Sequence, residues 1–288
     1  MKRKEAIKLM TAGTLGIGLS SSLTADASSP KPLALKGNIN HSVCRWCYRD
    51  IPLEQLADAA KEMGLVGVDI LTLPEWKTVI DRGLTCTMAS VEGAGIVKGF
   101  NDPNNHKDLQ NKFSAVIPKA AESGLKNIIC FSGNRNGMDD QVGLENCAIG
   151  LDPLIKLAEK HNVMIMMELL NSKVNHKDYM CDFTPWGVKL VEKIGSSNFK
   201  LLYDIYHMQI MEGDIIATIR DFNQYFGHYH TGGVPGRNEI DETQELYYPA
   251  IMQAIVDVGH KGFVAQEFVP ASGDPLRSLR ESIAICDV

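Results

Sequence analysis

Two kinds of hydrophobic pattern alternate along the chain from residue 37 to its end. Short apolar runs rich in β-branched residues predict buried strands, and longer runs with apolar positions every three or four residues predict amphipathic helices. The strands are expected at residues 37–43, 66–71, 84–89, 127–131, 163–168, 199–204, 228–231 and 262–267. The helices are expected at residues 52–63, 75–82, 105–123, 139–161, 185–194, 214–225, 244–258 and 275–286.

Strands that alternate with helices favour parallel pairing through helical crossovers. An open, doubly wound sheet is the structural alternative, but eight strand and helix units in a segment of about 250 residues fit a closed barrel better. We therefore predict an α/β fold, a (β/α)8 TIM barrel, over residues 37–288. In such barrels the functional groups stand at the carboxyl ends of the strands.

The first residues do not follow this alternation. A basic start at residues 2–4 is followed by an apolar and small-residue run and by an A-x-A cleavage pattern at residues 25–27. These features predict an export signal over residues 1–27, of the twin-arginine or the general secretory type, and a linker over residues 28–36. The apolar part is too short and too rich in Gly and Ser to span a membrane stably. We expect a periplasmic or otherwise exported protein.

Composition and charge narrow the function classes. With 44% hydrophobic residues among 288, the chain can bury a sizeable core, and its net charge of -6 argues against nucleic acid as a partner. The seven cysteines are odd in number and scattered, so a disulfide scaffold is not expected. Cys44 and Cys47 have the spacing of a redox motif, for which a local disulfide and a pair of ordinary thiols both remain open.

The expected strand at residues 228–231 carries two histidines and leads into a loop rich in glycine. Side chains two positions apart in a strand share a face, so His228 and His230 point the same way. Only His230 lies at the end of the strand, next to the loop. A histidine in a strand is most often a structural residue, but its position makes His230 a candidate metal ligand.

Carboxylates end the other three of the last four expected strands: Glu168, Asp204 and Glu267. Each alone could be a helix cap or a surface ion pair, but four possible ligands at the same ends of successive strands make that explanation weak. Clustered, desolvated carboxylates repel one another and cost several kcal/mol each unless paired. A bound divalent cation removes both costs. Oxygen ligands with one imidazole suit Mn²⁺ or Mg²⁺ best, with Co²⁺ and Zn²⁺ as alternatives.

Four segments resemble the motifs of the xylose isomerase-like barrel superfamily. They are Glu168, Tyr-Asp-Ile-Tyr-His at residues 203–207, His-Thr-Gly-Gly-Val-Pro-Gly-Arg at residues 230–237, and Gln-Glu at residues 266–267. Within the superfamily the chain is similar to the hydroxypyruvate isomerase and ketose 3-epimerase group over residues 37–288. Hydroxypyruvate isomerases generally carry glutamine where this chain has His230, whereas the sugar epimerases carry histidine. The predicted export signal is a second difference, because the usual enzymes of this group are cytoplasmic.

The resemblance implies a metal-dependent isomerase or epimerase that acts on a small hydroxy-carbonyl compound, hydroxypyruvate-like or a ketose. Such a reaction removes the proton from a carbon next to the carbonyl group and returns one, through an enediolate. A divalent ion that holds both substrate oxygens stabilises the enediolate. Glu168 and Glu267 are then the catalytic pair, each both metal ligand and acid or base.

Three further residues are candidates for substrate binding. His207 follows Asp204 by three residues and could donate to a substrate oxygen, or could make only a hydrogen bond at a helix start. Arg237, beyond the glycines, could hold a carboxylate, phosphate or hydroxyl group, or could be exposed to solvent. Trp46, beside the end of the first strand, could form a wall of the pocket or serve only in packing.

Competing functions fit the sequence less well. A phosphodiesterase like the apurinic endonucleases of the same superfamily needs additional metal ligands and binds polyanionic DNA, which the acidic balance disfavours. A periplasmic sugar-binding barrel without catalytic activity needs no pair of opposed glutamates. A dehydrogenase is disfavoured because no G-x-G-x-x-G follows the first strand. The expected partner is a small molecule, and a homo-oligomer is compatible with the sequence.

Overall fold

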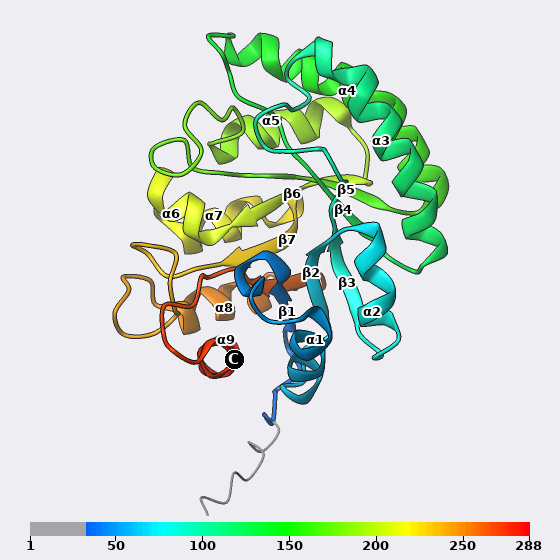
Figure 1. Cartoon of the computed structure of the whole chain (residues 1–288). Helices are drawn as coiled ribbons and strands as arrows, with labels where there is room; N and C mark the ends of the chain where they lie inside the picture. Colours follow the sequence, from blue (N-terminus) through cyan, green and yellow to red (C-terminus); the bar gives the residue numbers. More distant parts are fainter. Residues whose placement is uncertain (1–32) are drawn as a thin grey trace, which may run out of the picture. The chain divides into compact units, whose positions relative to one another are not determined.

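The computed structural model describes residues 33–288, in which eight parallel strands close into a barrel in the order of the chain. Strand β1 pairs with β2 on one side and with β8 on the other, which closes the sheet. In Figure 1 the helices surround this barrel on the outside. The predicted TIM barrel is confirmed. The strands are β1 (Asn40–Cys44), β2 (Gly67–Leu71), β3 (Thr85–Ala89), β4 (Asn127–Cys130), β5 (Met164–Glu168), β6 (Phe199–Asp204), β7 (Phe226–Thr231) and β8 (Phe263–Gln266).

The helices occupy most of the ranges predicted from the sequence pattern. The α-helices are α1 (Leu53–Glu62), α2 (Trp76–Ile80), α3 (Pro103–Glu122), α4 (Asp140–His161), α5 (Thr184–Ile194), α6 (Ile205–Met211), α7 (Ile215–Phe222), α8 (Tyr248–Asp257) and α9 (Pro275–Cys286). Short 3₁₀ helices are η1 (Arg45–Tyr48), η2 (Leu73–Glu75) and η3 (Asn223–Tyr225). Helix α8 begins later than predicted, and the range predicted as one helix at residues 214–225 is divided between α7 and η3.

Helix α6 was not predicted, and it lies directly after strand β6. Asp204 ends the strand and also caps the helix, because its Oδ1 accepts a hydrogen bond of 3.0 Å from the backbone N–H of His207. The transition without a loop fixes the direction of the Asp204 side chain at the end of the barrel.

The predicted export signal at residues 1–27 lies outside the described residues, as does the first part of the predicted linker. Residues 33–36 have no regular secondary structure. None of the helices within residues 33–288 is long and apolar enough to cross a membrane.

The interior of the barrel is filled by a small apolar cluster of its own, and the larger core lies between the strands and the surrounding helices. Met88, Ile129, Met166 and Leu202, from strands β3 to β6, form the interior cluster. The barrel is therefore packed below its carboxyl end and has no continuous pore.

Strand β2 is irregular against β3. The register shifts on both sides of Asp69, which pairs with Met88, while Leu71 pairs with Ala89. The residue between them, Ile70, has a φ of 55°, in the left-handed region that a β-branched side chain rarely adopts. Such a conformation costs on the order of 1–3 kcal/mol and persists only where the surrounding structure enforces it.

Candidate metal centre

The four side chains predicted as ligands converge at the carboxyl end of the barrel. Glu168 ends β5, Asp204 ends β6, His230 lies in β7 and Glu267 follows β8. One ligand atom from each lies within 4.8 Å of the others, and all four residues are buried. The strand register explains part of this convergence, because Asp204 pairs directly with His230.

The imidazole of His230 is the centre of the cluster. Its Nδ1 lies 3.0 Å from Oε1 of Glu168 and 2.7 Å from Oε2 of Glu267. Its other nitrogen, Nε2, lies 2.7 Å from Oδ2 of Asp69, which the sequence analysis did not single out. The ring therefore presents one nitrogen to the predicted ligand set and the other to the interior of the barrel.

Arg237 extends into the cluster. The sequence left open whether this side chain lies in the site or is exposed to solvent, and it lies in the site. Its Nη2 lies 2.9 Å from Oδ2 of Asp204 and also contacts Oε2 of Glu267. The guanidinium group lies 5.1 Å from the ring centroids of both Trp46 and Tyr206. A cation between two aromatic faces is favourable, so Arg237 is held in place from three sides.

The loop after β7 needs glycine to deliver Arg237. A Cβ on Gly233 would lie 2.4 Å from the carbonyl oxygen of Glu239, because the loop folds back on itself there. The backbone N–H of Gly233 donates to the carbonyl of Asn238, and that of Arg237 donates to the carbonyl of Gly233. The glycine-rich loop predicted from the sequence is thus a tight, hydrogen-bonded turn.

Trp46 and His207 take different places in the site. The indole Nε1 of Trp46 donates a hydrogen bond of 2.6 Å to Oε1 of Glu267, so this tryptophan orients a predicted catalytic residue as well as packing. The ring of His207 is fully buried behind Arg237, with its Nε2 3.0 Å from Nη1 of that residue. Its Nδ1 lies 2.6 Å from the side-chain amide nitrogen of Asn171. Burial and Arg237 lower the pKa of His207 well below its usual value, so the ring is neutral.

A cavity of about 290 Å³ opens next to the cluster. One side carries the charged groups of Glu168, Glu267 and Arg237, and the other side is mainly apolar. The volume is at the lower end of the range for small-molecule sites. The remaining lining residues are Trp46, Ile70, Ile96, Phe131, Leu170 and His176.

Crowding of three carboxylates shifts their protonation. Burial, together with the charge of Glu267, raises the pKa of Glu168, although His230 opposes this. Burial also raises the pKa of Asp204 despite the nearby guanidinium group of Arg237. Burial would raise the pKa of Glu267 too, but the charges of Arg237 and His230 outweigh it and hold that pKa well below its usual value. The protein by itself therefore supplies too little positive charge for all three carboxylates to be ionised.

The donor set fits a hard divalent cation. Three carboxylates and one imidazole are ligands that suit Mn²⁺ or Mg²⁺, and a cation among them would neutralise the repulsion just described. The structure thus brings together the four predicted ligands, together with Trp46 and Arg237, around one cavity, and it places His207 behind Arg237.

Asp69 was not predicted as a site residue, because it lies inside a strand and not at its end. The signal was an acidic residue inside the apolar strand at residues 66–71. Its side chain is completely buried. Burial would raise the pKa of Asp69, but contacts with His228 and His230 lower it, so the carboxylate is ionised.

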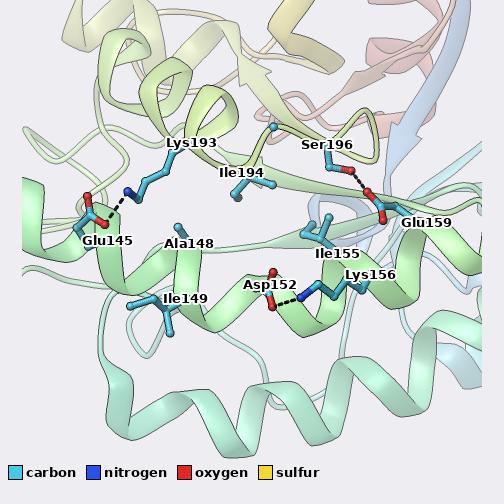
Figure 2. A pocket seen from close by; sticks show the side chains of 11 residues that line it. Glu145, Ala148, Ile149, Asp152, Ile155, Lys156, Glu159, Lys193, Ile194 and Ser196 are labelled. Atoms are coloured by element: carbon cyan, nitrogen blue, oxygen red, sulfur yellow. Dashed lines mark hydrogen bonds and ion pairs between the residues drawn. The ribbon is translucent and has the colours of Figure 1, made fainter.

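Two further features are a hollow outside the barrel and the cysteines, of which Cys44 lies 3.8 Å from Nε2 of His230. A hollow of about 600 Å³ lies on the outside of the barrel between α4 and α5 (Figure 2). Glu145 pairs with Lys193, Asp152 pairs with Lys156, and Glu159 accepts a hydrogen bond from Ser196, so no charged group there is available to a ligand without loss of a partner. All seven cysteines, including Cys44 and Cys47, are free thiols.

Comparison with known proteins agrees with this geometry. The sequence profile of the family described as xylose isomerase-like TIM barrel matches residues 48–286. The chain belongs to this family. A human relative named "Putative hydroxypyruvate isomerase" is 29% identical over 239 residues, which cover 81% of this chain and 80% of the human protein. The 2-oxo-tetronate isomerase of Pectobacterium atrosepticum is 24% identical over 236 residues, 77% of this chain and 88% of that protein.

Solved structures of other proteins share the fold. A family 2 AP endonuclease from Brucella melitensis superimposes with a TM-score of 0.75 at 22% identity, over 84% of this chain and 97% of that one. A D-psicose 3-epimerase from Clostridium cellulolyticum, solved with D-tagatose, gives a TM-score of 0.66 at 20% identity, over 85% and 90% of the two chains. At these identities the structures establish the barrel alone. The named sequence relatives are isomerases, the class of enzyme to which this chain belongs.

Metal binding should stabilise the protein more at pH 8 than at pH 6. In the metal-free protein the raised pKa values of Glu168 and Asp204 contribute stability that is present below their ordinary pKa values, near ~4, and is lost as the pH rises through the raised values. A bound cation removes this loss, because it requires the ionised carboxylates. The measurement is the shift in melting temperature between chelator-treated and Mn²⁺-saturated protein, where a ligand at 100 times its Kd adds about 2.7 kcal/mol.

The matched control for this measurement is Asp152→Asn, which removes an exposed carboxylate on α4 and should leave the pH dependence of the metal-induced shift unchanged. Asp204→Asn should reduce that dependence. A shift that is equal at both pH values, or larger at pH 6, would contradict the protonation described for the metal-free site.

Proposed function

We propose that the protein is a divalent-metal-dependent isomerase or epimerase of a small hydroxy-carbonyl compound, in which Glu168 and Glu267 transfer a proton through an enediolate. The observation that carries the proposal is the position of the two glutamates. They contact the same nitrogen of His230, at 3.0 and 2.7 Å, and both line the 290 Å³ cavity. A substrate carbon in that cavity is within reach of two carboxylates.

The two glutamates are held differently, which suggests different roles. Both oxygens of Glu267 have partners, since Trp46 donates to Oε1 and Arg237 donates to Oε2. Glu168 contacts His230 through Oε1, and its Oε2 has no hydrogen-bond partner among residues 33–288. The raised pKa of Glu168 makes it the more basic of the two. We therefore assign the first proton abstraction to Glu168, and proton return to Glu267 where the configuration is inverted.

Protein groups can protect the enediolate once it forms. The cation, when bound by the four ligands, supplies the charge that stabilises the two oxygens of the enediolate. The apolar side of the cavity, formed by Ile70, Ile96, Phe131 and Leu170, limits the access of water. A low local dielectric strengthens the electrostatic interactions within the site and suppresses side reactions of the intermediate.

The substrate class we favour is a short 2-oxo acid with a neighbouring hydroxyl group. Arg237 is the only Lys or Arg side chain that lines the cavity in the described part of the chain, and arginine matches carboxylate geometry. The apolar side offers few hydrogen-bond partners for the several hydroxyl groups of a hexulose. The names of the two isomerase relatives, hydroxypyruvate and 2-oxo-tetronate isomerase, support the same class.

The main test is proton exchange in deuterated water. The Mn²⁺-loaded protein is incubated with hydroxypyruvate and with ketoses, and entry of deuterium at the carbon next to the carbonyl group is followed by NMR. Label entry is expected, because proton removal and return pass through the solvent-exchangeable glutamates. Bound substrate with no label would instead support a sugar-binding barrel without catalytic activity.

Replacement of the ligands should separate metal binding from proton transfer. Glu168→Gln and Glu267→Gln keep an oxygen near the ion but remove the acid or base, which should lower the rate of exchange by about 10²–10⁴ at any metal concentration. Asp204→Ala should mainly weaken metal binding, so excess Mn²⁺ should restore part of its activity. Near wild-type turnover of either Gln variant at saturating Mn²⁺ would show that the glutamates serve only as ligands.

Arg237→Met should discriminate between the candidate substrates. Methionine keeps much of the packing against Trp46 and Tyr206 but removes the charge. If Arg237 holds a substrate carboxylate, KM for hydroxypyruvate should rise by about 10- to 100-fold, as for loss of a charge-assisted hydrogen bond, and KM for a neutral ketose should change little. An equal rise for both would assign Arg237 to the support of Glu267 and Asp204.

Export from the cytoplasm remains part of the proposal. Cleavage after residue 27 should leave a mature protein that begins at Ser28. N-terminal sequencing of the periplasmic or secreted fraction checks this prediction, and an exported protein that still begins at Met1 would contradict it.

A further inference from the structure

We infer that Asp69 is a positioning residue, which holds Nε2 of His230 and so fixes the ring orientation in which Nδ1 faces the other three ligands. The inference rests on the proposed metal-dependent function. It concerns a residue inside the barrel that touches neither the cavity nor the predicted ligand atoms of Glu168, Asp204 and Glu267.

The contact between Asp69 and His230 determines the state of the imidazole. Oδ2 of Asp69 lies 2.7 Å from Nε2 of His230, and both side chains are completely buried. An ionised carboxylate can only accept a hydrogen bond, so Nε2 of His230 donates to Asp69. Nδ1 is thereby turned toward Glu168 and Glu267, where it would present its lone pair to a bound cation in exchange for its proton. A carboxylate behind a ligating histidine fixes the ring and increases its basicity.

A chain of hydroxyl groups fixes Asp69 in turn. Oγ1 of Thr87 donates a hydrogen bond of 2.5 Å to Oδ1 of Asp69. Oγ of Ser42 lies 2.6 Å from the same Thr87 oxygen. Because Asp69 only accepts, the proton of Thr87 points to it and Ser42 is the donor to Thr87. Ser42, Thr87, Asp69 and His230 thus form one buried line from β1 and β3 through β2 to β7.

The backbone irregularity of β2 is what allows this arrangement. In a regular strand, consecutive side chains point to opposite faces. Here Asp69 contacts His230 inside the barrel, and the next residue, Ile70, lines the cavity at its carboxyl end. The register shifts beside Asp69 and the φ of 55° at Ile70 place both side chains on the inner face. Bulges of this kind redirect side chains next to active sites.

His228 gives Asp69 a second contact, which raises the alternative that the aspartate serves only the fold. Nε2 of His228 lies 3.3 Å from Oδ2 of Asp69, within the packed interior. A purely structural Asp69 would satisfy two buried histidines and leave the metal affinity of the folded protein unaffected by its replacement. Metal affinity therefore distinguishes the two roles, whereas stability does not.

The test compares Mn²⁺ binding to metal-free wild-type protein and to Asp69→Asn by isothermal titration calorimetry. Asn keeps the volume but loses the charge and can turn its NH₂ group toward Nε2. The variant should bind Mn²⁺ about 10- to 100-fold more weakly, the usual cost of losing such a partner. Thr87→Val, which removes only the hydroxyl group behind Asp69, should weaken binding less. It also provides the decisive comparison if Asp69→Asn does not fold.

Asp182→Asn is the matched control, because Asp182 is also a buried carboxylate but pairs with Arg135, away from His230. Its Mn²⁺ affinity should equal that of the wild type.

Unchanged Mn²⁺ affinity in folded Asp69→Asn and Thr87→Val would overturn the inference. That result leaves the proposed function intact, because the wild type still binds the metal. Absence of Mn²⁺ binding by the wild type would instead refute the proposed function and, with it, the role of Asp69 in holding a metal ligand.

Discussion

Three buried carboxylates around one imidazole are the interaction on which the site depends. Their repulsion in a region of low dielectric is too large to be left uncompensated. The guanidinium group of Arg237 and the indole N–H of Trp46 compensate part of this repulsion, and burial raises the pKa values of Glu168 and Asp204. These groups supply less positive charge than three ionised carboxylates need, and a divalent cation would supply the rest. The same deficit makes the site reactive, because a carboxylate with a raised pKa beside a cavity is a competent base.

The closed barrel is what brings the three carboxylates and the imidazole together. Parallel strands place all their carboxyl ends at one end of the structure, so single acidic residues that are far apart in the sequence become neighbours. The pairing of β6 with β7 puts Asp204 opposite His230, and the loop after β7 returns Arg237 to both. The packed cluster of Met88, Ile129, Met166 and Leu202 closes the barrel below. Substrate can therefore approach only from the open end.

A second polar layer lies beneath the ligands and depends on local strain. The unfavourable backbone of Ile70 lets two consecutive side chains of β2 serve the interior, one in the hydrogen-bond line to His230 and the other in the cavity wall. Stability is lost at one residue, and the orientation of a ligand is gained at another. Proteins commonly hold such strain next to functional sites, where the surrounding packing enforces it.

The sequence by itself determined the order of strands and helices, the barrel and the four residues at the strand ends. The periodicity of hydrophobic residues is a local property of the sequence. In a parallel barrel, residues at the carboxyl ends of the strands all lie at the same end of the barrel. Helix α6 was not predicted from the sequence, because Asp204 both ends a strand and caps the helix that follows it. Only the tertiary structure decided that Arg237 is enclosed, that His207 lies behind it and that Asp69 supports His230. Those facts depend on loop closure, on register shifts and on which inward side chains meet across the barrel, and contacts between residues so distant in the chain have no local signature.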